Sequence, residues 1–316
     1  MLSRVAESIY WMCRYVERAE NIARFIDVNH NLSIDLPTEL GGQWEPLLLT
    51  TSGLLAFQED YEAINQENVI SFLALDKKNP NSILSSLHQA RENARSVREI
   101  ISSEMWRHIN EMYLTVKENS TNANITTGDS NPFFRKLITD SSTFIGLMDT
   151  TFSHGEAWHF GILGRYMERS DKTARIIDMK YYYLLPSINH VGTTIDILQW
   201  LALLKSASAF EMYRKSFGKL DIKNIIRFLA LDRNFPRSIR YSLVSAERSL
   251  HEISGSKKYD FANLPEKRMG MFRSELDYTD VDEIVTKGLH EYLTELLERL
   301  NSVGESIDET FFQMRE

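Results

Sequence analysis

The chain has 316 residues, of which 43% are hydrophobic and 25% are charged, and this composition is typical of a globular protein. The 14 glycines and 7 prolines are too few for the many tight turns of a β-sandwich, a β-barrel or a dinucleotide-binding α/β sheet. A net charge of −8 argues against a general nucleic-acid binder, and the single cysteine excludes an intramolecular disulfide and a cysteine-rich zinc site.

The N-terminal residues lack the basic and then apolar layout of a signal peptide. The longest apolar runs, such as residues 47–57, are too short to span a lipid bilayer. We therefore expect a cytoplasmic protein with neither nucleic acid nor a membrane as a partner.

Residues 9–28 form the first predicted helix. Apolar side chains recur there at steps of three and four, the period of one helix face: Ile9, Met12, Val16, Ala19, Ala23 and Ile26. Charged and amide side chains gather on the opposite face: Arg14, Glu17, Arg18, Asn21 and Arg24. The same pattern predicts a helix over residues 160–181.

Further helices follow along the chain with the same period. We expect them over residues 44–61, about 81–117, 200–217 and 281–313. Asn79 and Pro80 are typical of a helix start, because the first residue can cap the helix and the second needs no N–H donor there. The predicted fold class is therefore all-α.

Three strings occur twice, in the same order. Residues 13–24, "CRYVERAENIAR", match residues 164–175, "GRYMERSDKTAR", at six of twelve positions. "FLALDKKNPNSI" at 72–83 matches "FLALDRNFPRSI" at 228–239, and "MDTTF" at 148–152 resembles "IDETF" at 307–311. We predict a duplicated helical bundle of two similar halves, residues 1–153 and 154–316, packed about a pseudo-twofold axis in one body.

The doubled charged string has three interpretations. Exposed ion pairs contribute little, so a solvated face should tolerate lysine for arginine, yet Arg14, Arg18 and Arg24 recur as arginine in the second copy. If the two copies face each other, two glutamates and six arginines would form an electropositive interior that needs an anion, more carboxylates or water. A structural charge network, an anion-binding cleft and a solvated face all stay open, with Asp27 and Asp178, and Glu20 and Asp171, as candidate local partners.

A third string of the same kind lies at residues 90–95, with Arg91, Glu92, Asn93 and Arg95. It could add Glu–Arg pairs to the same interior. Its counterpart at 245–252 keeps only part of the pattern, which weakens a strictly twofold site.

Glu156 and His159 form a Glu-x-x-His pair of the kind that binds metal in di-metal helical bundles. Such a site needs a second pair, and the nearest substitute is His108 with Glu104 and Glu111. A structural histidine is the favoured interpretation, so we expect neither a metal nor another cofactor. No P-loop and no nucleophile arrangement is present.

Taken together, residues 1–28, 79–99 and 155–178 resemble the alpha-E domain family, an all-helical bacterial family named for its helices and Glu-Arg motifs. The resemblance covers essentially the whole chain. It implies a gene beside, or fused to, a circularly permuted ATP-grasp protein of the peptide-ligase type, often with a transglutaminase-like peptidase nearby. It implies no catalytic residue.

The leading hypothesis is a helical accessory protein, not an independent enzyme, that binds a separate ATP-grasp ligase or its peptide product through an anion-accepting cleft. The alternatives are a metal-assisted enzyme using Glu156, His159, His108 or the pair Glu17 and Glu168, and a structural homo-oligomeric scaffold. The candidate ligand-binding residues are the members of the three charged strings: Arg14, Glu17, Arg18, Arg24, Arg91, Glu92, Asn93, Arg95, Arg165, Glu168, Arg169 and Arg175.

Overall fold

The computed structural model describes residues 1–35, 44–122, 124–127, 131–182 and 193–313. Every regular element among these residues is a helix, which confirms the predicted all-α class. None of these helices is both long and apolar enough to cross a lipid bilayer.

The elements that precede residue 152 begin with one long helix and end with another. In chain order they are α1 (Ser3–Asp35), α2 (Glu45–Thr50), α3 (Leu54–Asp60), α4 (Gln66–Ile70), the π-helix η1 (Ser71–Leu75), α5 (Ile83–Ser96), α6 (Ser103–Asn119), α7 (Asn124–Thr127) and α8 (Asn131–Thr151).

The later elements also start with a long helix. In chain order they are α9 (Glu156–Tyr182), α10 (Thr194–Ser206), α11 (Phe210–Phe217), α12 (Ile222–Leu231), α13 (Ile239–Ser254), α14 (Leu264–Tyr278), α15 (Val281–Lys287), α16 (Leu289–Ile307) and the π-helix η3 (Asp308–Phe312).

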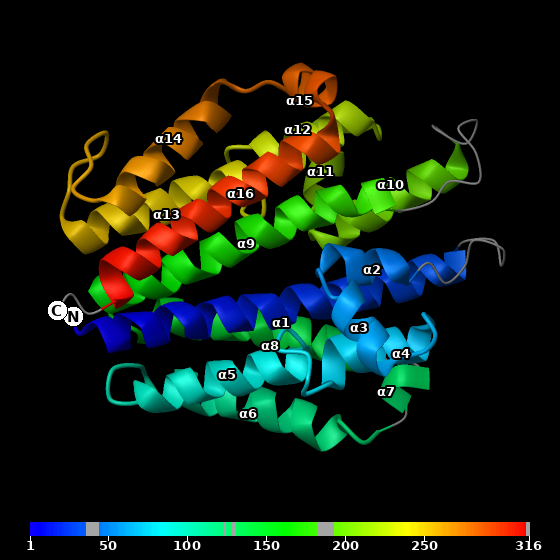
Figure 1. Ribbon diagram of the computed structural model, residues 1–316, viewed down its shortest axis with the longest axis horizontal. Helices are drawn as coiled ribbons and strands as arrows, with labels where there is room; N and C mark the ends of the chain where they lie inside the picture. The colour runs from blue at the N-terminus through cyan, green and yellow to red at the C-terminus, as the bar shows by residue number, and fades with distance from the viewer. Residues whose placement is uncertain (36–43, 123, 128–130, 183–192, 314–316) are drawn as a thin grey trace.

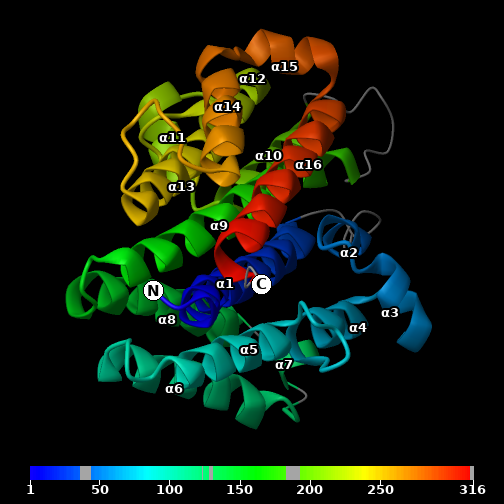
Figure 2. The same cartoon turned by 60° about the vertical axis from the view of Figure 1, so that its left-hand side comes forward.

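Helices α1 and α9 run side by side through the middle of the molecule (Figure 1). Helices α5 and α8 pack against α1, and α6 packs against both of them; α13 and α16 pack against α9, and α14 packs against both of those (Figure 2). Two helices contact the long helix of the other group: α2 packs against α9, and α10 packs against α1. Apolar side chains from the helices around α1 and from those around α9 belong to one continuous core.

Gly164 sets how closely α1 and α9 approach. A Cβ atom at this position would overlap the backbone carbonyl oxygen of Tyr10, which belongs to α1. Glycine therefore lets the two backbones touch. Cys13, which matches Gly164 in the alignment of the two charged strings, is itself buried. The close approach brings the charged faces of the two helices together.

Two of the predicted helices are interrupted at a serine with a left-handed backbone. The predicted helix over 44–61 divides into α2 and α3 near Ser52, whose φ is 56°, and that over 200–217 divides into α10 and α11 near Ser208, whose φ is 51°. A left-handed residue cannot continue a right-handed helix, so the predicted continuity was wrong at both places.

Two other predicted helices also divide. Between α15 and α16, Gly288 has a φ of 99°. Between α5 and α6, Ser102 caps the new helix by accepting a hydrogen bond from the Met105 N–H at 3.2 Å. The predicted start of this region was displaced as well, because Ser82, and not Asn79, is the residue that caps α5.

The division into halves at residues 153 and 154 stays a prediction. The boundary falls in the short connection between α8 and α9.

Candidate functional site

Two Glu–Arg pairs link α1 to α9 where the helices meet, each with its glutamate on one helix and its arginine on the other. Arg169 of α9 donates two hydrogen bonds to Glu17 of α1, at 2.8 and 2.7 Å. Arg18 of α1 donates two to Glu168 of α9, at 2.7 and 3.1 Å. Glu17 is 2% exposed and Glu168 is fully buried, so the interpretation of this string as a solvated face was wrong. Paired, bidentate geometry of this kind is what stabilises a buried charge.

On one side of this crossing, three guanidinium groups surround two carboxylates, and we call this group of residues the closed network. It consists of Glu17, Glu20, Asn21, Arg24, Arg169 and Arg237. Arg237, in the segment before α13, contacts both Glu17, at 3.4 Å, and Glu20. Arg24 binds Glu20 at 2.6 Å and reaches Ser208 at 2.5 Å. Three cations and two carboxylates are thus joined by ion pairs.

Burial alone would raise the pKa of Glu17, but the Arg169 and Arg237 guanidinium groups outweigh that effect and lower it to about 2. Burial is also the main reason why the pKa of Arg237 falls to about 10, against the raising effect of Glu20. Both groups are charged at neutral pH, so the closed network is held together as ions.

The other side of the crossing is the open network, which consists of Arg14, Arg18, Asn81, Glu168, Asp171, Lys172 and Arg175. Arg14 joins Arg18 on Glu168, at 2.9 Å. Arg18 also donates to the Asn81 side-chain oxygen at 2.8 Å. In the matching strings 72–83 and 228–239, Asn81 stands where Arg237 stands. The open network therefore has a neutral amide at the position that supplies a cation to the closed network.

The rest of the open network is held by short contacts along α9. Arg175 binds Asp171 at 3.0 Å and donates to the Ser52 hydroxyl at 3.1 Å. Lys172 lies 2.8 Å from Asp171 and 3.4 Å from Glu168. Of the expected local partners, Glu20 and Asp171 bind Arg24 and Arg175, whereas Asp27 pairs with Arg135 and Asp178 with His290, away from the charged strings.

A cavity of about 230 Å³ adjoins the open network, and we call it the inner cavity. Four cationic side chains line it, Arg14, Arg18, Lys172 and Arg175, against two carboxylates, those of Glu168 and Asp171. Burial would raise the pKa of Glu168, but Arg18, Lys172 and Arg14 hold it well below its ordinary value. With both carboxylates ionised, the lining has two positive charges in excess.

Thr50, at the end of α2, also lines the inner cavity. It is 3% exposed, and its hydroxyl makes no hydrogen bond among the described residues. A buried hydroxyl without a partner is costly unless something accepts or donates to it. Ser52, next to it in the lining, holds a left-handed backbone, and such strain gathers at binding sites. The inner cavity is therefore suited to a small anion that also accepts hydrogen bonds.

Arg165 does not repeat the role of Arg14. It donates to the Tyr166 hydroxyl at 3.0 Å and its guanidinium carbon lies 4.7 Å from the Tyr166 ring centre, whereas Arg14 binds Glu168. The structure thus brings three candidates to the closed network, Glu17, Arg24 and Arg169, and four to the open network, Arg14, Arg18, Glu168 and Arg175.

The predicted site residues did not include Arg237 of the closed network, Lys172 of the open network or Thr50 of the inner cavity. Comparison of the strings at 72–83 and 228–239 could have identified Arg237.

The third charged string lies outside this region. Arg91 of α5 donates to Asn110 of α6 at 2.7 Å, and Glu92 accepts from Arg91 and Arg95. Asn93 accepts a hydrogen bond from Ser96 through its backbone carbonyl. These contacts join α5 to α6 and to itself, so the string adds no Glu–Arg pair to the crossing of α1 and α9.

Glu156 and His159 have different partners. Glu156 accepts from the N-terminal amine at 3.0 Å, and His159 Nδ1 lies 3.5 Å from the Ser249 hydroxyl. His108 bonds the Asp140 carbonyl at 2.7 Å. Within the part of the chain that the structure describes, no group of three or more His, Cys, Asp or Glu side chains could hold a metal ion.

Comparison with known proteins gives a family and distant relatives. The family model of Alpha-E, described as a predicted alpha-helical domain with a conserved ER motif, matches residues 1–312. The uncharacterized protein Mb2597 of Mycobacterium bovis is 23% identical over 93% of this chain and 35% of its own length, and the uncharacterized protein Rv2567 of Mycobacterium tuberculosis is 22% identical over the same shares. The chain thus spans about a third of the length of these curated relatives. No solved structure matches. Because the match covers nearly the whole chain, and Glu17-Arg18 and Glu168-Arg169 are dipeptides of the described kind, the chain belongs to the Alpha-E family.

Proposed function

We propose that this protein binds a small anionic group, a carboxylate or a phosphate, in the inner cavity. The observation that carries the proposal is a cavity whose lining has two excess positive charges and the buried, unpartnered hydroxyl of Thr50. Guanidinium groups bind carboxylates and phosphates with paired hydrogen bonds, and a cavity of about 230 Å³ is large enough to hold such a group.

The charge state of the two central glutamates supports binding over acid–base catalysis. A general acid or base works best with a pKa near the working pH. The arginines lower the pKa of Glu17 to about 2, against the raising effect of burial, and they hold that of Glu168 well below its ordinary value in the same way. Neither carboxylate is suited to take up and release a proton near neutral pH.

The partner follows from the family resemblance. The protein serves an ATP-grasp amide-bond-forming ligase, and the anion is the carboxylate of its peptide or peptide-tag product, with a transglutaminase-like peptidase as a further partner. Two observations support this assignment: membership of the Alpha-E family, and curated relatives about three times as long as this chain, which carry additional sequence on the same polypeptide.

The two networks are, in this proposal, copies of one ancestral unit that have diverged. Arg24 and Arg175 each bind an acidic residue four positions earlier and a serine with a left-handed backbone, Ser208 and Ser52 respectively. A crystal structure tests this directly. Superposition of α1–α8 on α9–α16 should pair Glu17 with Glu168, and a superposition that does not pair them would contradict the duplication.

The binding proposal is tested with inorganic phosphate and a matched pair of variants, Arg175→Gln and Arg24→Gln. Each variant loses an i,i+4 ion pair and a serine contact, so we expect similar losses of thermal stability. Only Arg175 lines the inner cavity. At constant ionic strength, phosphate should therefore raise the melting temperature of the wild type and of Arg24→Gln, and not that of Arg175→Gln. An equal phosphate effect in all three proteins, or none in the wild type, contradicts the proposal.

The partner assignment has its own test. The ATP-grasp protein encoded nearest to this gene should co-purify with the chain, and its ligation rate should change when the chain is added. Neither binding nor a rate change would contradict the assignment, while leaving the anion site standing.

A further inference from the structure

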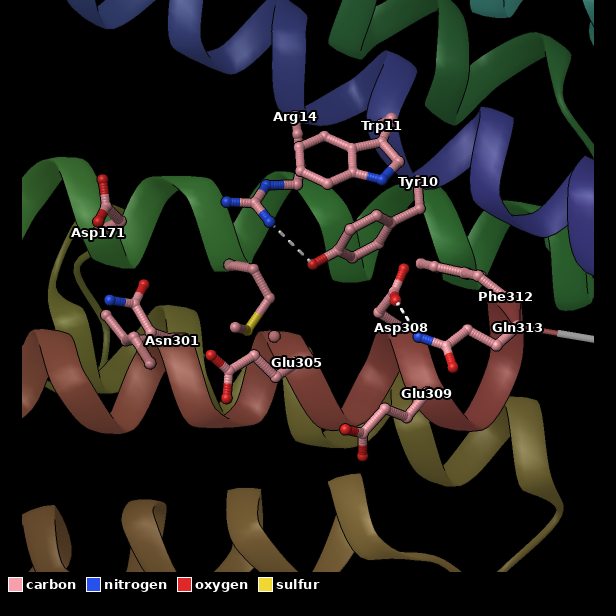
Figure 3. A pocket seen from close by; sticks show the side chains of 13 residues that line it. Tyr10, Trp11, Arg14, Asp171, Asn301, Glu305, Asp308, Glu309, Phe312 and Gln313 are labelled. Atoms are coloured by element: carbon pink, nitrogen blue, oxygen red, sulfur yellow. Dashed lines mark hydrogen bonds between the residues drawn. The ribbon is translucent and has the colours of Figure 1, made fainter.

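The inner cavity continues into a second cavity of about 490 Å³, which we call the outer cavity. Arg14, Asp171 and Asn301 line both, so the two adjoin as one cleft between α1, α9 and α16. Figure 3 shows the outer cavity with Arg14, Trp11 and Tyr10 on the α1 side and the side chains of α16 and η3 on the other.

The outer cavity has the opposite charge to the inner one. Three carboxylates reach it from the C-terminal elements, those of Glu305, Asp308 and Glu309, and none of the three has a salt bridge among the described residues (Figure 3). Asp308 accepts a hydrogen bond from the neutral Gln313 side chain at 2.8 Å. Arg14, at the junction, is the one cation in this lining within the described ranges. The cleft is thus cationic at its inner end and anionic at its outer end.

Helix geometry gives the length of the cleft. From Asn301, at the junction, to Asp308, the first residue of η3, is seven residues, and at 1.5 Å per residue the outer part of the cleft is about 10 Å long. An extended tripeptide spans about 10 Å from its amino to its carboxyl end. The positive end lies beyond Asn301 in the inner cavity, so the two charged ends are separated by at least the span of a tripeptide.

The outer cavity also has an apolar wall. The rings of Tyr10, Trp11 and Phe312 line it, and the guanidinium carbon of Arg14 lies 4.6 Å from the Trp11 ring centre. A wall of this kind can contact the backbone and small side chains of a peptide while charged groups fix its direction. Neither a simple anion nor a simple cation would use both ends.

We propose that the cleft binds a short peptide with free carboxyl and amino groups. Its carboxylate lies in the inner cavity with Arg18, Arg175 and Thr50, and its ammonium group lies in the outer cavity with Glu305 and Asp308. This inference rests on the proposed function, since it identifies the anion of the inner cavity as the carboxylate of that peptide.

Calorimetric titration with three ligands of three glycine residues each tests the proposal: triglycine, N-acetyl-triglycine and triglycinamide. Acetylation removes only the positive charge, and amidation removes only the negative charge. Triglycine should bind, and each modified ligand should bind about tenfold more weakly, because one charged contact is lost. N-acetyl-triglycine that binds as tightly as triglycine would overturn the proposal.

Glu305→Gln and Glu298→Gln form a matched pair of variants for the outer end. Both glutamates are exposed on α16, but only Glu305 lines the cleft. Glu305→Gln should weaken triglycine binding about fivefold or more and leave N-acetyl-triglycine unchanged, whereas Glu298→Gln should change neither. Equal effects of the two variants would contradict the assignment of the ammonium end.

Titration with inorganic phosphate distinguishes failure of the peptide inference from failure of the proposed anion site. If phosphate binds the wild type and not Arg175→Gln, but the three glycine ligands bind alike or not at all, the peptide inference fails and the anion site stands. If phosphate and triglycine both fail to bind the wild type, the proposed function fails with it.

Discussion

On the Glu17 side of the α1–α9 crossing, Arg237 reaches in and contacts both Glu17 and Glu20. On the Glu168 side, the matching position in the chain is Asn81, a neutral amide that accepts from Arg18, and a cavity lies beside it. The same buried Glu–Arg chemistry thus forms a filled network on one side and a cationic cavity on the other. The two sides differ at the Arg237 and Asn81 position, and the open side gains its excess positive charge from Arg14 and Lys172, which line the cavity.

The largest effect is expected from removing one central carboxylate. Glu17→Gln leaves Arg169 buried without its carboxylate and Arg237 with Glu20 alone, and we expect a loss of about 3–5 kcal/mol in the free energy of unfolding, measured by denaturant titration. Glu168→Gln should cost less, because Arg14 and Arg18 are more exposed than Arg169. Phosphate should restore part of the stability of Glu168→Gln and none of that of Glu17→Gln. Equal restoration would contradict the distinction between the two sides.

Acid should weaken the closed network over a defined range of pH. Because the folded pKa of Glu17 is lowered to about 2, its contribution is complete above the unfolded value of about 4.3 and is lost as the pH falls through about 2. The integrated contribution is about 3 kcal/mol. The free energy of unfolding of the wild type should therefore fall between about pH 4.3 and 2 more steeply than that of Glu17→Gln. Parallel curves would show that Glu17 titrates normally.

Arg237→Asn gives the closed network the same residue type at this position as the open network, which has Asn81 there. We expect a loss of about 3 kcal/mol, since a partner of two buried carboxylates is removed. The variant should not gain an anion site, because Arg24 and Arg169 then balance Glu17 and Glu20. Phosphate titration should therefore give the same stoichiometry as the wild type. A second bound phosphate would contradict the charge argument.

The smallest effect on stability is expected at the inner cavity itself. Thr50→Val keeps the shape of the side chain and removes a hydroxyl without a hydrogen-bond partner, so the free energy of unfolding should change by less than about 1 kcal/mol or rise slightly. Phosphate affinity should nevertheless fall several-fold. If affinity is unchanged, Thr50 does not contact the anion.

Local periodicity was enough to predict the all-α fold, while the contact between the two charged strings was one of three interpretations that the sequence left open. The 3.6-residue period of 9–28 and the retained arginines pointed to a buried role, and the burial of Glu17 and Glu168 bears this out. The helix breaks at Ser52 and Ser208 could not be predicted, because a left-handed serine has no distinctive sequence signal. Arg237 and Thr50 were missed because their roles depend on which segments fold against α1 and α9.

The most direct measurement is a crystal structure of the wild type grown with selenate, whose anomalous signal locates the anion. We expect one selenate in the inner cavity, within hydrogen-bond distance of Arg175 and Thr50, and none beside Arg237 in the closed network. Selenate at both sides of the crossing, or at neither, would contradict the account of an open and a closed network.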